Sequence, residues 1–187
     1  MDSLKRHIPN VLSVSRIFAA ALFVLVYDNT SLQRFIWAVA IAFAALGTDF
    51  LDGHLARKWN VTSRIGYFLD GLGDKTFHLS ILLVIFREGP SSAILIWLLI
   101  AREVALYALR GLDSRLVENL LNLRQFSRYH AFFIRIYFGA FFMFDWLRFA
   151  GPAPQGIMMF GDASGWIAVG IGYFAIARLI QSIVRES

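Results

Sequence analysis

The sequence predicts an all-α integral membrane protein with six transmembrane helices. Hydrophobic residues make up 58% of its 187 residues, above the soluble norm of about 45–50%. The mean hydropathy is +0.60. Six apolar stretches, each about as long as a helix that crosses a bilayer, alternate with short polar segments. We therefore expect a single membrane domain that covers residues 1–187.

The polar segments of the chain set the boundaries of the six expected spans. Residues 1–10 form a basic interfacial lead, and Pro9 suits the first turn of a helix. Gly89 and Pro90 break the chain, and the glycines and prolines of residues 151–162 predict a loop. Leucines at mixed three- and four-residue spacing in residues 111–128 predict an amphipathic linker on the membrane surface. The six expected spans cover residues 11–27, 35–51, 65–86, 92–110, 129–149 and 163–184.

The basic residues predict the orientation of these spans. With the N-terminus inside, ten basic residues lie at the inner side, and only Arg34, Arg87 and Arg148 lie outside. The positive-inside rule therefore places both termini in the cytoplasm, at the inner membrane if the source is bacterial. The net charge of +5 suits anionic lipids as well as nucleic acid, but the high apolar content favours lipid, and we expect no nucleic-acid partner. The ten inner residues are Lys5, Arg6, Arg57, Lys58, Arg64, Arg110, Arg115, Arg124, Arg128 and Arg185.

Four aspartates lie close together between residues 48 and 75, in an apolar setting. Asp49 and Asp52 are three residues apart, and Asp70 and Asp74 are four apart. At about 100° per residue, each pair falls on one face of a helix. Their mutual repulsion and desolvation are tolerable if they share cations. Carboxylate oxygens suit Mg²⁺, Mn²⁺ or Ca²⁺, and a chain without cysteine has no thiolate site.

The neighbours of these aspartates suit a phosphate ligand. Gly53 would let a ligand approach the backbone closely, and Gly66 permits close helix contact one turn before Asp70. Arg57 lies one helical turn beyond Gly53 and could bind a phosphate through two hydrogen bonds. Hard cations, a phosphate-binding arginine and a membrane surface together suggest phosphoryl or phosphatidyl transfer on a lipid.

The whole pattern resembles the signature of the CDP-alcohol phosphatidyltransferases. It reads Asp49-x2-Asp52-Gly53-x2-Ala56-Arg57, eight residues, then Gly66-x3-Asp70-x3-Asp74, and all eight fixed positions are present. Pro9-Asn10 followed by Leu12-Ser13-x2-Arg16 is similar to the N-terminal entry of the same family.

This resemblance implies a polar cavity that opens to the cytoplasm and binds CDP-diacylglycerol. It implies two divalent ions, Mg²⁺ or Mn²⁺, and an alcohol acceptor that loses its proton to Asp74 as the general base. Lys75 would assist at the phosphate, and membrane lipid and a second copy in a homodimer are the further partners that the resemblance implies. By the same resemblance, the metal ligands would be Asp49, Asp52, Asp70 and Asp74, and the CDP-lipid would contact Gly53, Ala56, Arg57 and Gly66.

The acceptor has to be inferred from other residues. Residues 100–104 and 56–60 resemble those of the phosphatidylglycerophosphate synthases, which use glycerol 3-phosphate. Arg124-Gln125-Phe126-Ser127-Arg128 replaces their usual Gly-Lys-x-Lys-Thr run, and Gly71-Leu72-Gly73 replaces a Pro- and Ala-containing segment. The alternatives are a cardiolipin synthase of the CDP-lipid type and another acceptor specificity in the family. The expected acceptor-binding residues are Lys75, Arg102, Arg110, Arg124 and Arg128.

Two functions outside this family are the further alternatives for the chain. A divalent-cation transporter would use the same aspartates but would leave Gly53, Ala56, Arg57 and Gly66 unexplained, and a non-catalytic scaffold would bind no CDP-lipid. Arg102 and Glu103 either form an internal ion pair or point separately, one to the acceptor cavity and one to a neighbouring helix, because adjacent residues do not share a helix face. Arg16 is expected to contact lipid headgroups at the interface.

Overall fold

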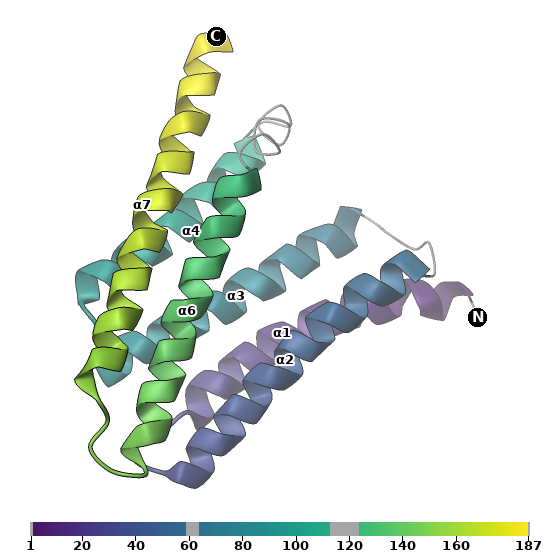
Figure 1. Ribbon diagram of the computed structural model, residues 1–187. Helices are drawn as coiled ribbons and strands as arrows, with labels where there is room; N and C mark the ends of the chain where they lie inside the picture. Colours follow the sequence, from purple (N-terminus) through teal and green to yellow (C-terminus); the bar gives the residue numbers. More distant parts are fainter. Residues whose placement is uncertain (1, 59–63, 113–123, 187) are drawn as a thin grey trace. The chain divides into compact units, whose positions relative to one another are not determined.

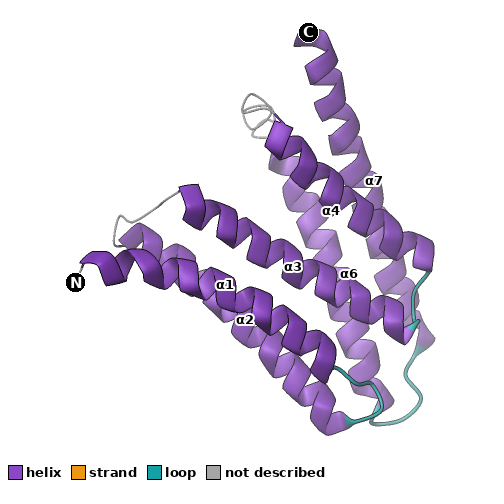
Figure 2. Cartoon of the chain, turned by 180° about the vertical axis from the view of Figure 1, so that it is seen from behind, coloured by secondary structure: helices purple, strands orange, loops and turns teal. Residues whose placement is uncertain are grey.

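The computed structural model describes the backbone of residues 2–58, 64–112 and 124–186. The described chain consists of helices and loops and contains no strand (Figures 1 and 2), which confirms the all-α prediction for these residues. Many of the helices are longer than the spans expected from the apolar stretches alone. The described helices are α1 (Asp2–Val26), α2 (Leu32–Lys58), α3 (Arg64–Glu88), α4 (Ala93–Leu112), α6 (Arg124–Arg148) and α7 (Gln155–Glu186).

The chain divides into two compact units, Met1–Val84 and Ile85–Ser187. In the first unit, α1 packs along α2. The ring of Phe23 lies 5.6 Å from that of Tyr27 and 5.7 Å from that of Phe77 on α3, measured between centroids. Tyr27 in turn contacts Phe35 of α2 edge-on at 5.8 Å. These buried aromatic rings therefore join all three helices of the unit, and such contacts add about 0.5–1.5 kcal/mol per pair beyond burial.

A short turn connects α1 to α2, as the polar residues 28–31 predict. Asp28 accepts hydrogen bonds from the backbone N–H and the hydroxyl of Thr30, at 2.9 and 2.6 Å. Its other carboxylate oxygen accepts from Arg34 at 2.8 Å. Aspartate favours turns because its side chain can bond the backbone two residues on.

In the second unit, α7 packs along α6 and also contacts α4. Two buried glycines of α7 allow this packing. A Cβ on Gly161 would lie 2.8 Å from the Cβ of Ala140 on α6, and one on Gly165 would lie 3.1 Å from a methyl group of Leu95 on α4. Small residues at such positions let helix backbones approach closely, as in many membrane bundles.

The prediction of a loop over residues 151–162 is wrong from Gln155 onward. Helix α7 begins at Gln155, and the backbone N–H of Ile157 already bonds the carbonyl of Pro154. The turn residues that favoured a loop serve other purposes: Pro154 precedes the first helical turn, and Gly161 is a helix-packing residue. Glycine therefore marked close contact between α6 and α7, not a break in the helix.

Three other predicted segments end differently from expectation. The basic interfacial lead is helical from Asp2 and continues into the first span as α1. The polar residues 57–64, between the expected spans 35–51 and 65–86, belong in part to helices, because α2 ends at Lys58 and α3 begins at Arg64. The expected amphipathic linker at 111–128 overlaps the end of α4 and the start of α6, and its residues 113–123 lie outside the described part of the chain.

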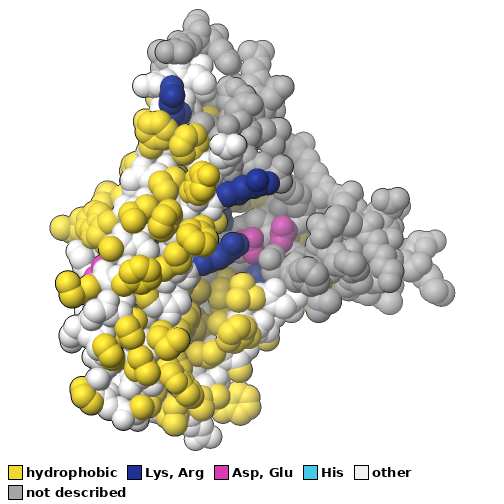
Figure 3. Space-filling view, in the orientation of Figure 1, with side chains coloured by type: hydrophobic (Ala, Val, Ile, Leu, Met, Phe, Trp, Pro, Cys, Tyr) yellow, Lys and Arg dark blue, Asp and Glu magenta, His cyan; other side chains and the backbone are white. Residues whose placement is uncertain are grey.

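One described helical segment, Gln155–Ser182, is long and apolar enough to cross a membrane, and two shorter ones are Val11–Val26 and Leu32–Thr48. Large apolar side chains are also strongly exposed, including Phe18 at 72% and Phe43 at 70%. Figure 3 shows hydrophobic side chains gathered over α6 and α7. Apolar surface of this extent is typical of contact with lipid or with another protein. The count of six spans stays a prediction.

Candidate active site

The second aspartate pair lies on one face of α3, as its spacing predicts. One nitrogen of Arg16, Nη1, donates hydrogen bonds to Oδ1 of Asp70 at 3.3 Å and to Oδ1 of Asp74 at 2.6 Å. The Arg16 side chain is only 2% exposed, whereas those of Asp70 and Asp74 are 44% and 46% exposed. The two carboxylates therefore bond a buried guanidinium although their own side chains are nearly half exposed.

Arg16 was expected to contact lipid headgroups, and that prediction is wrong. Its side chain turns into the unit and bonds the aspartates of α3, because a buried guanidinium is stable only when paired. The contact depends on a close approach of α1 to α3: a Cβ on Gly73 would lie 2.8 Å from the carbonyl oxygen of Ser13. Sequence reasoning missed this partner because 54 residues separate Arg16 from Asp70.

The first aspartate pair lies near the C-terminal end of α2. The backbone of Asp49 and Asp52 is helical, and so is that of Gly53, Ala56 and Arg57, but their side chains lie outside the described residues. The same holds for Arg110 on α4 and Arg124 on α6. The roles predicted for all of these residues therefore stay predictions.

The described donors suit a hard divalent cation. Asp70 and Asp74 direct one oxygen each at a single positive group, the guanidinium nitrogen of Arg16. Oxygen ligands of this kind are those that Mg²⁺ and Mn²⁺ prefer. The described side chains form no group of three or more metal-type ligands, and the two further ligands expected, Asp49 and Asp52, are not among them.

The surroundings of Asp74 order the helix around it. His78 Nδ1 lies 3.2 Å from the carbonyl oxygen of Asp74, and the Thr76 hydroxyl donates to the carbonyl of Leu72 at 2.8 Å. Lys75 and Gly66 are half-buried. Both bonds stay within α3 and involve the backbone of the helix that carries Asp74.

A second charged cluster lies inside the other unit. Arg102 donates a short hydrogen bond to Glu103, and Glu103 Oε1 lies 3.3 Å from Nε2 of His130 on α6. The other ring nitrogen of His130 lies 2.9 Å from the carbonyl oxygen of Ala168 on α7. All three side chains are at most 5% exposed. The cluster therefore links α4, α6 and α7.

Of the two interpretations of Arg102 and Glu103, the internal ion pair is the one observed. The expectation that one points to a cavity and the other to a neighbouring helix holds only in part: Glu103 reaches His130 on α6, but Arg102 is buried and bonds Glu103. The role of Arg102 at the acceptor remains a prediction. Arg128, another expected acceptor residue, is exposed on α6.

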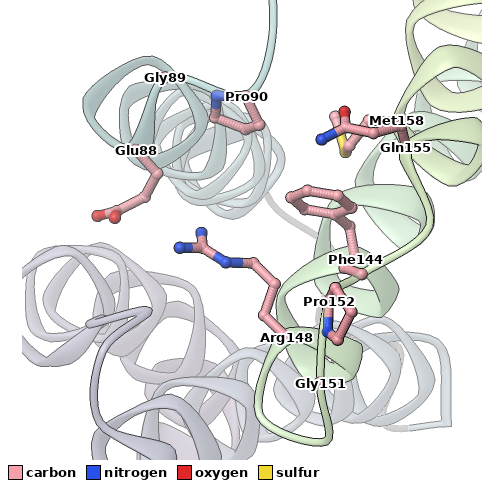
Figure 4. Close-up of a pocket in the computed structure, with 10 residues that line it drawn as sticks. Glu88, Gly89, Pro90, Phe144, Arg148, Gly151, Pro152, Gln155 and Met158 are labelled. Atoms are coloured by element: carbon pink, nitrogen blue, oxygen red, sulfur yellow. The ribbon is translucent and has the colours of Figure 1, made fainter.

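A pocket of about 550 Å³ opens in the second unit, at the turns that follow α3 and α6 (Figure 4). The carboxylate of Glu88 and the guanidinium of Arg148 point toward each other across it. None of the predicted site residues lines this pocket.

These features describe an all-helical chain with extensive exposed apolar surface and a pair of acidic side chains that share a buried arginine. The profile of the CDP-alcohol phosphatidyltransferase family matches residues 6–174, and the chain belongs to this family. The match extends well beyond the aspartate signature and covers every described helix at least in part.

Three relatives are named CDP-diacylglycerol–glycerol-3-phosphate 3-phosphatidyltransferase. The chain is similar to the protein of Rickettsia bellii, with 32% identity over 57% of this chain and 59% of the relative. It is 35% identical to the protein of Haemophilus influenzae, over 62% of this chain and 63% of the relative. It is 37% identical to the protein of Escherichia coli K12, over 56% of this chain and 58% of the relative. The chain thus spans about three fifths of the length of the curated relatives that it matches.

Proposed function

We propose that this protein transfers the phosphatidyl group of CDP-diacylglycerol to an alcohol acceptor, with glycerol 3-phosphate as the leading acceptor, and releases CMP. The observation that carries the proposal is the convergence of Asp70 and Asp74, two carboxylates of the family signature, on one positive group. The names of the three relatives support the donor and the acceptor. Formation of phosphatidylglycerophosphate would place the protein in phospholipid biosynthesis.

In this reaction, Asp74 accepts the proton of the acceptor hydroxyl. The oxygen then attacks the phosphorus that carries the diacylglycerol, a new P–O bond forms, and the bond to CMP breaks. Arg57 binds a phosphate of the donor while Gly53, Ala56 and Gly66 leave room for the nucleotide. Arg110, Arg124 and Arg128 attract an anionic acceptor, with Lys75 at the phosphate.

Asp49, Asp52, Asp70 and Asp74 would hold Mg²⁺ or Mn²⁺. When bound, two such ions neutralise the diphosphate and stabilise both the attacking and the leaving oxygen. The chain itself supplies the carboxylates, one of which is the base that accepts the proton of the acceptor hydroxyl. The half-exposed state of Asp70 and Asp74 supports this assignment, because a ligand can reach them from the open side.

An acceptor panel tests the proposal. Purified protein in detergent is given labelled CDP-diacylglycerol with Mn²⁺ and, in separate reactions, glycerol 3-phosphate or phosphatidylglycerol. We expect CMP release and labelled phosphatidylglycerophosphate in the first reaction. Labelled cardiolipin in the second would instead assign a cardiolipin synthase. Mn²⁺ flux into proteoliposomes without CMP release would overturn the proposal in favour of a cation transporter.

We further propose six membrane spans, with both termini and the aspartates on the cytoplasmic side. The natural chain has no cysteine, so single cysteines can be labelled without background. A membrane-impermeant maleimide added to intact cells should label Ser92→Cys, which the topology places outside, and should spare Ser187→Cys. The reverse pattern would invert the topology. A homodimer, the remaining partner, is tested by the mass of the detergent-solubilised protein.

A further inference from the structure

The guanidinium of Arg16 shares one nitrogen between the two aspartates of α3. Nη1 is 2.6 Å from Asp74 and 3.3 Å from Asp70, and both contacts use Oδ1. The arginine is 2% exposed and comes from a different helix, α1. It is therefore held in place by burial, whereas the carboxylates that it bonds are partly open.

The charges of these three groups indicate how they would interact with a divalent cation. Two carboxylates facing one guanidinium carry a net negative charge, and a divalent cation would neutralise them fully. Such a cation binds carboxylate oxygens at about 2.0–2.1 Å. A guanidinium bonded to the same oxygens would be repelled by it, so the two positive groups compete for one pair of ligands.

We infer that Arg16 is a positioning residue that holds Asp70 and Asp74 toward each other through their Oδ1 atoms, and that its charge lowers the affinity of these carboxylates for a divalent ion. It keeps two like-charged side chains on one site, and it weakens metal binding by electrostatic repulsion. The inference rests on the proposed function only for the identity of the ligands. It adds a role for a residue of α1, which lies outside the aspartate signature.

The close approach of the helices supports this role. Gly73 lies between the two aspartates on α3, and an added Cβ there would meet the Ser13 carbonyl at 2.8 Å and the Arg16 Cβ at 3.5 Å. The arginine is thus seated against the backbone of the helix that carries both ligands.

The test is Mn²⁺ affinity measured by electron paramagnetic resonance on the full chain in detergent, without substrate. Arg16→Gln removes the positive charge beside Asp70 and Asp74, and we expect Mn²⁺ to bind about tenfold more tightly because that repulsion is lost. Arg16→Lys keeps the charge but not the geometry of the guanidinium, and its affinity should lie between the two. Thermal unfolding should show a larger Mn²⁺-dependent rise for Arg16→Gln than for the natural protein.

A matched control is Arg34→Gln, which breaks the exposed ion pair with Asp28 in the same unit and should leave Mn²⁺ affinity unchanged. Unchanged or weaker Mn²⁺ binding by both Arg16→Gln and Arg16→Lys would overturn the inference. If Arg16→Gln fails to fold, Arg16→Lys alone decides by the same comparison. Binding is measured without turnover, so a failure of the proposed transferase activity would be seen separately, as an absence of CMP release.

Discussion

Arg16 and Arg102 are both almost completely buried, but their carboxylate partners differ greatly in exposure. Asp70 and Asp74 are close to half exposed, whereas Glu103 is 4% exposed and also contacts His130. Removing a partner from a closed pair leaves a buried charge, which is strongly destabilising. Partly exposed carboxylates such as Asp70 and Asp74 can instead take up a ligand on their exposed side. The difference predicts that the first cluster serves binding and chemistry, and the second serves the stability of its helices.

The largest effect is expected at the open cluster. Asp74→Asn removes the proposed base, and we expect the rate of CMP release to fall about 1000-fold, in the range of general-base catalysis. The rate is measured with labelled CDP-diacylglycerol and glycerol 3-phosphate, alongside a thermal unfolding curve that shows the variant is folded. Asp28→Asn, in the exposed turn between α1 and α2, is the control and should keep full activity. Full activity of Asp74→Asn would exclude Asp74 as the base.

At the closed cluster, Glu103→Gln should lower the free energy of unfolding by about 3 kcal/mol, because Arg102 keeps its charge and loses its counter-charge. The measurement is unfolding by denaturing detergent, followed by intrinsic fluorescence. Activity per folded molecule should change little.

The chain contains a natural control for that variant. Arg87 and Glu88 are also adjacent and form an ion pair at 2.8 Å, but Arg87 is 42% exposed. Solvent screens such a pair, so Glu88→Gln should cost less than about 1 kcal/mol. Equal effects of Glu103→Gln and Glu88→Gln would remove the distinction between closed and open clusters.

Much of the fold followed from short-range patterns in the sequence. Apolar stretches located the helices, and the four-residue spacing of Asp70 and Asp74 correctly predicted a shared face. The predictions that were wrong depended on packing between residues that are far apart in the sequence. Gly161 looks like a turn residue until Ala140 is placed against it, and Arg16 looks like an interfacial anchor until α3 is placed beside α1. Propensity and spacing describe one helix at a time and carry no information about such neighbours.

Two glycines of α3 test how the open cluster is assembled. Gly73→Ala would place a Cβ 2.8 Å from the Ser13 carbonyl, so α1 and α3 must separate, and we expect a loss of about 2 kcal/mol in unfolding free energy. Because Arg16 moves with α1, Mn²⁺ affinity should change as well.

The control is Gly71→Ala, half a turn away, where an added Cβ meets no atom within 4 Å. Alanine favours helix over glycine by about 1 kcal/mol, so Gly71→Ala should be neutral or stabilising. If Gly73→Ala behaved like Gly71→Ala, the close approach that seats Arg16 would be refuted.

Apart from the controls, the smallest effect is expected where α7 passes the closed cluster. A Cβ on Gly172 would lie 3.0 Å from Nε of Arg102 and 3.2 Å from Nδ1 of His130. Both side chains are buried and can shift only by a few tenths of an ångström, so Gly172→Ala should cost about 1 kcal/mol net, after the helix preference for alanine is subtracted. Gly170→Ala, two residues earlier, meets no atom within 4 Å and should gain stability instead. A loss of stability in Gly172→Ala with a gain in Gly170→Ala would show that the cluster tolerates no added volume. A gain of stability in both variants would mean that the side chains of the cluster can move apart at no cost in stability.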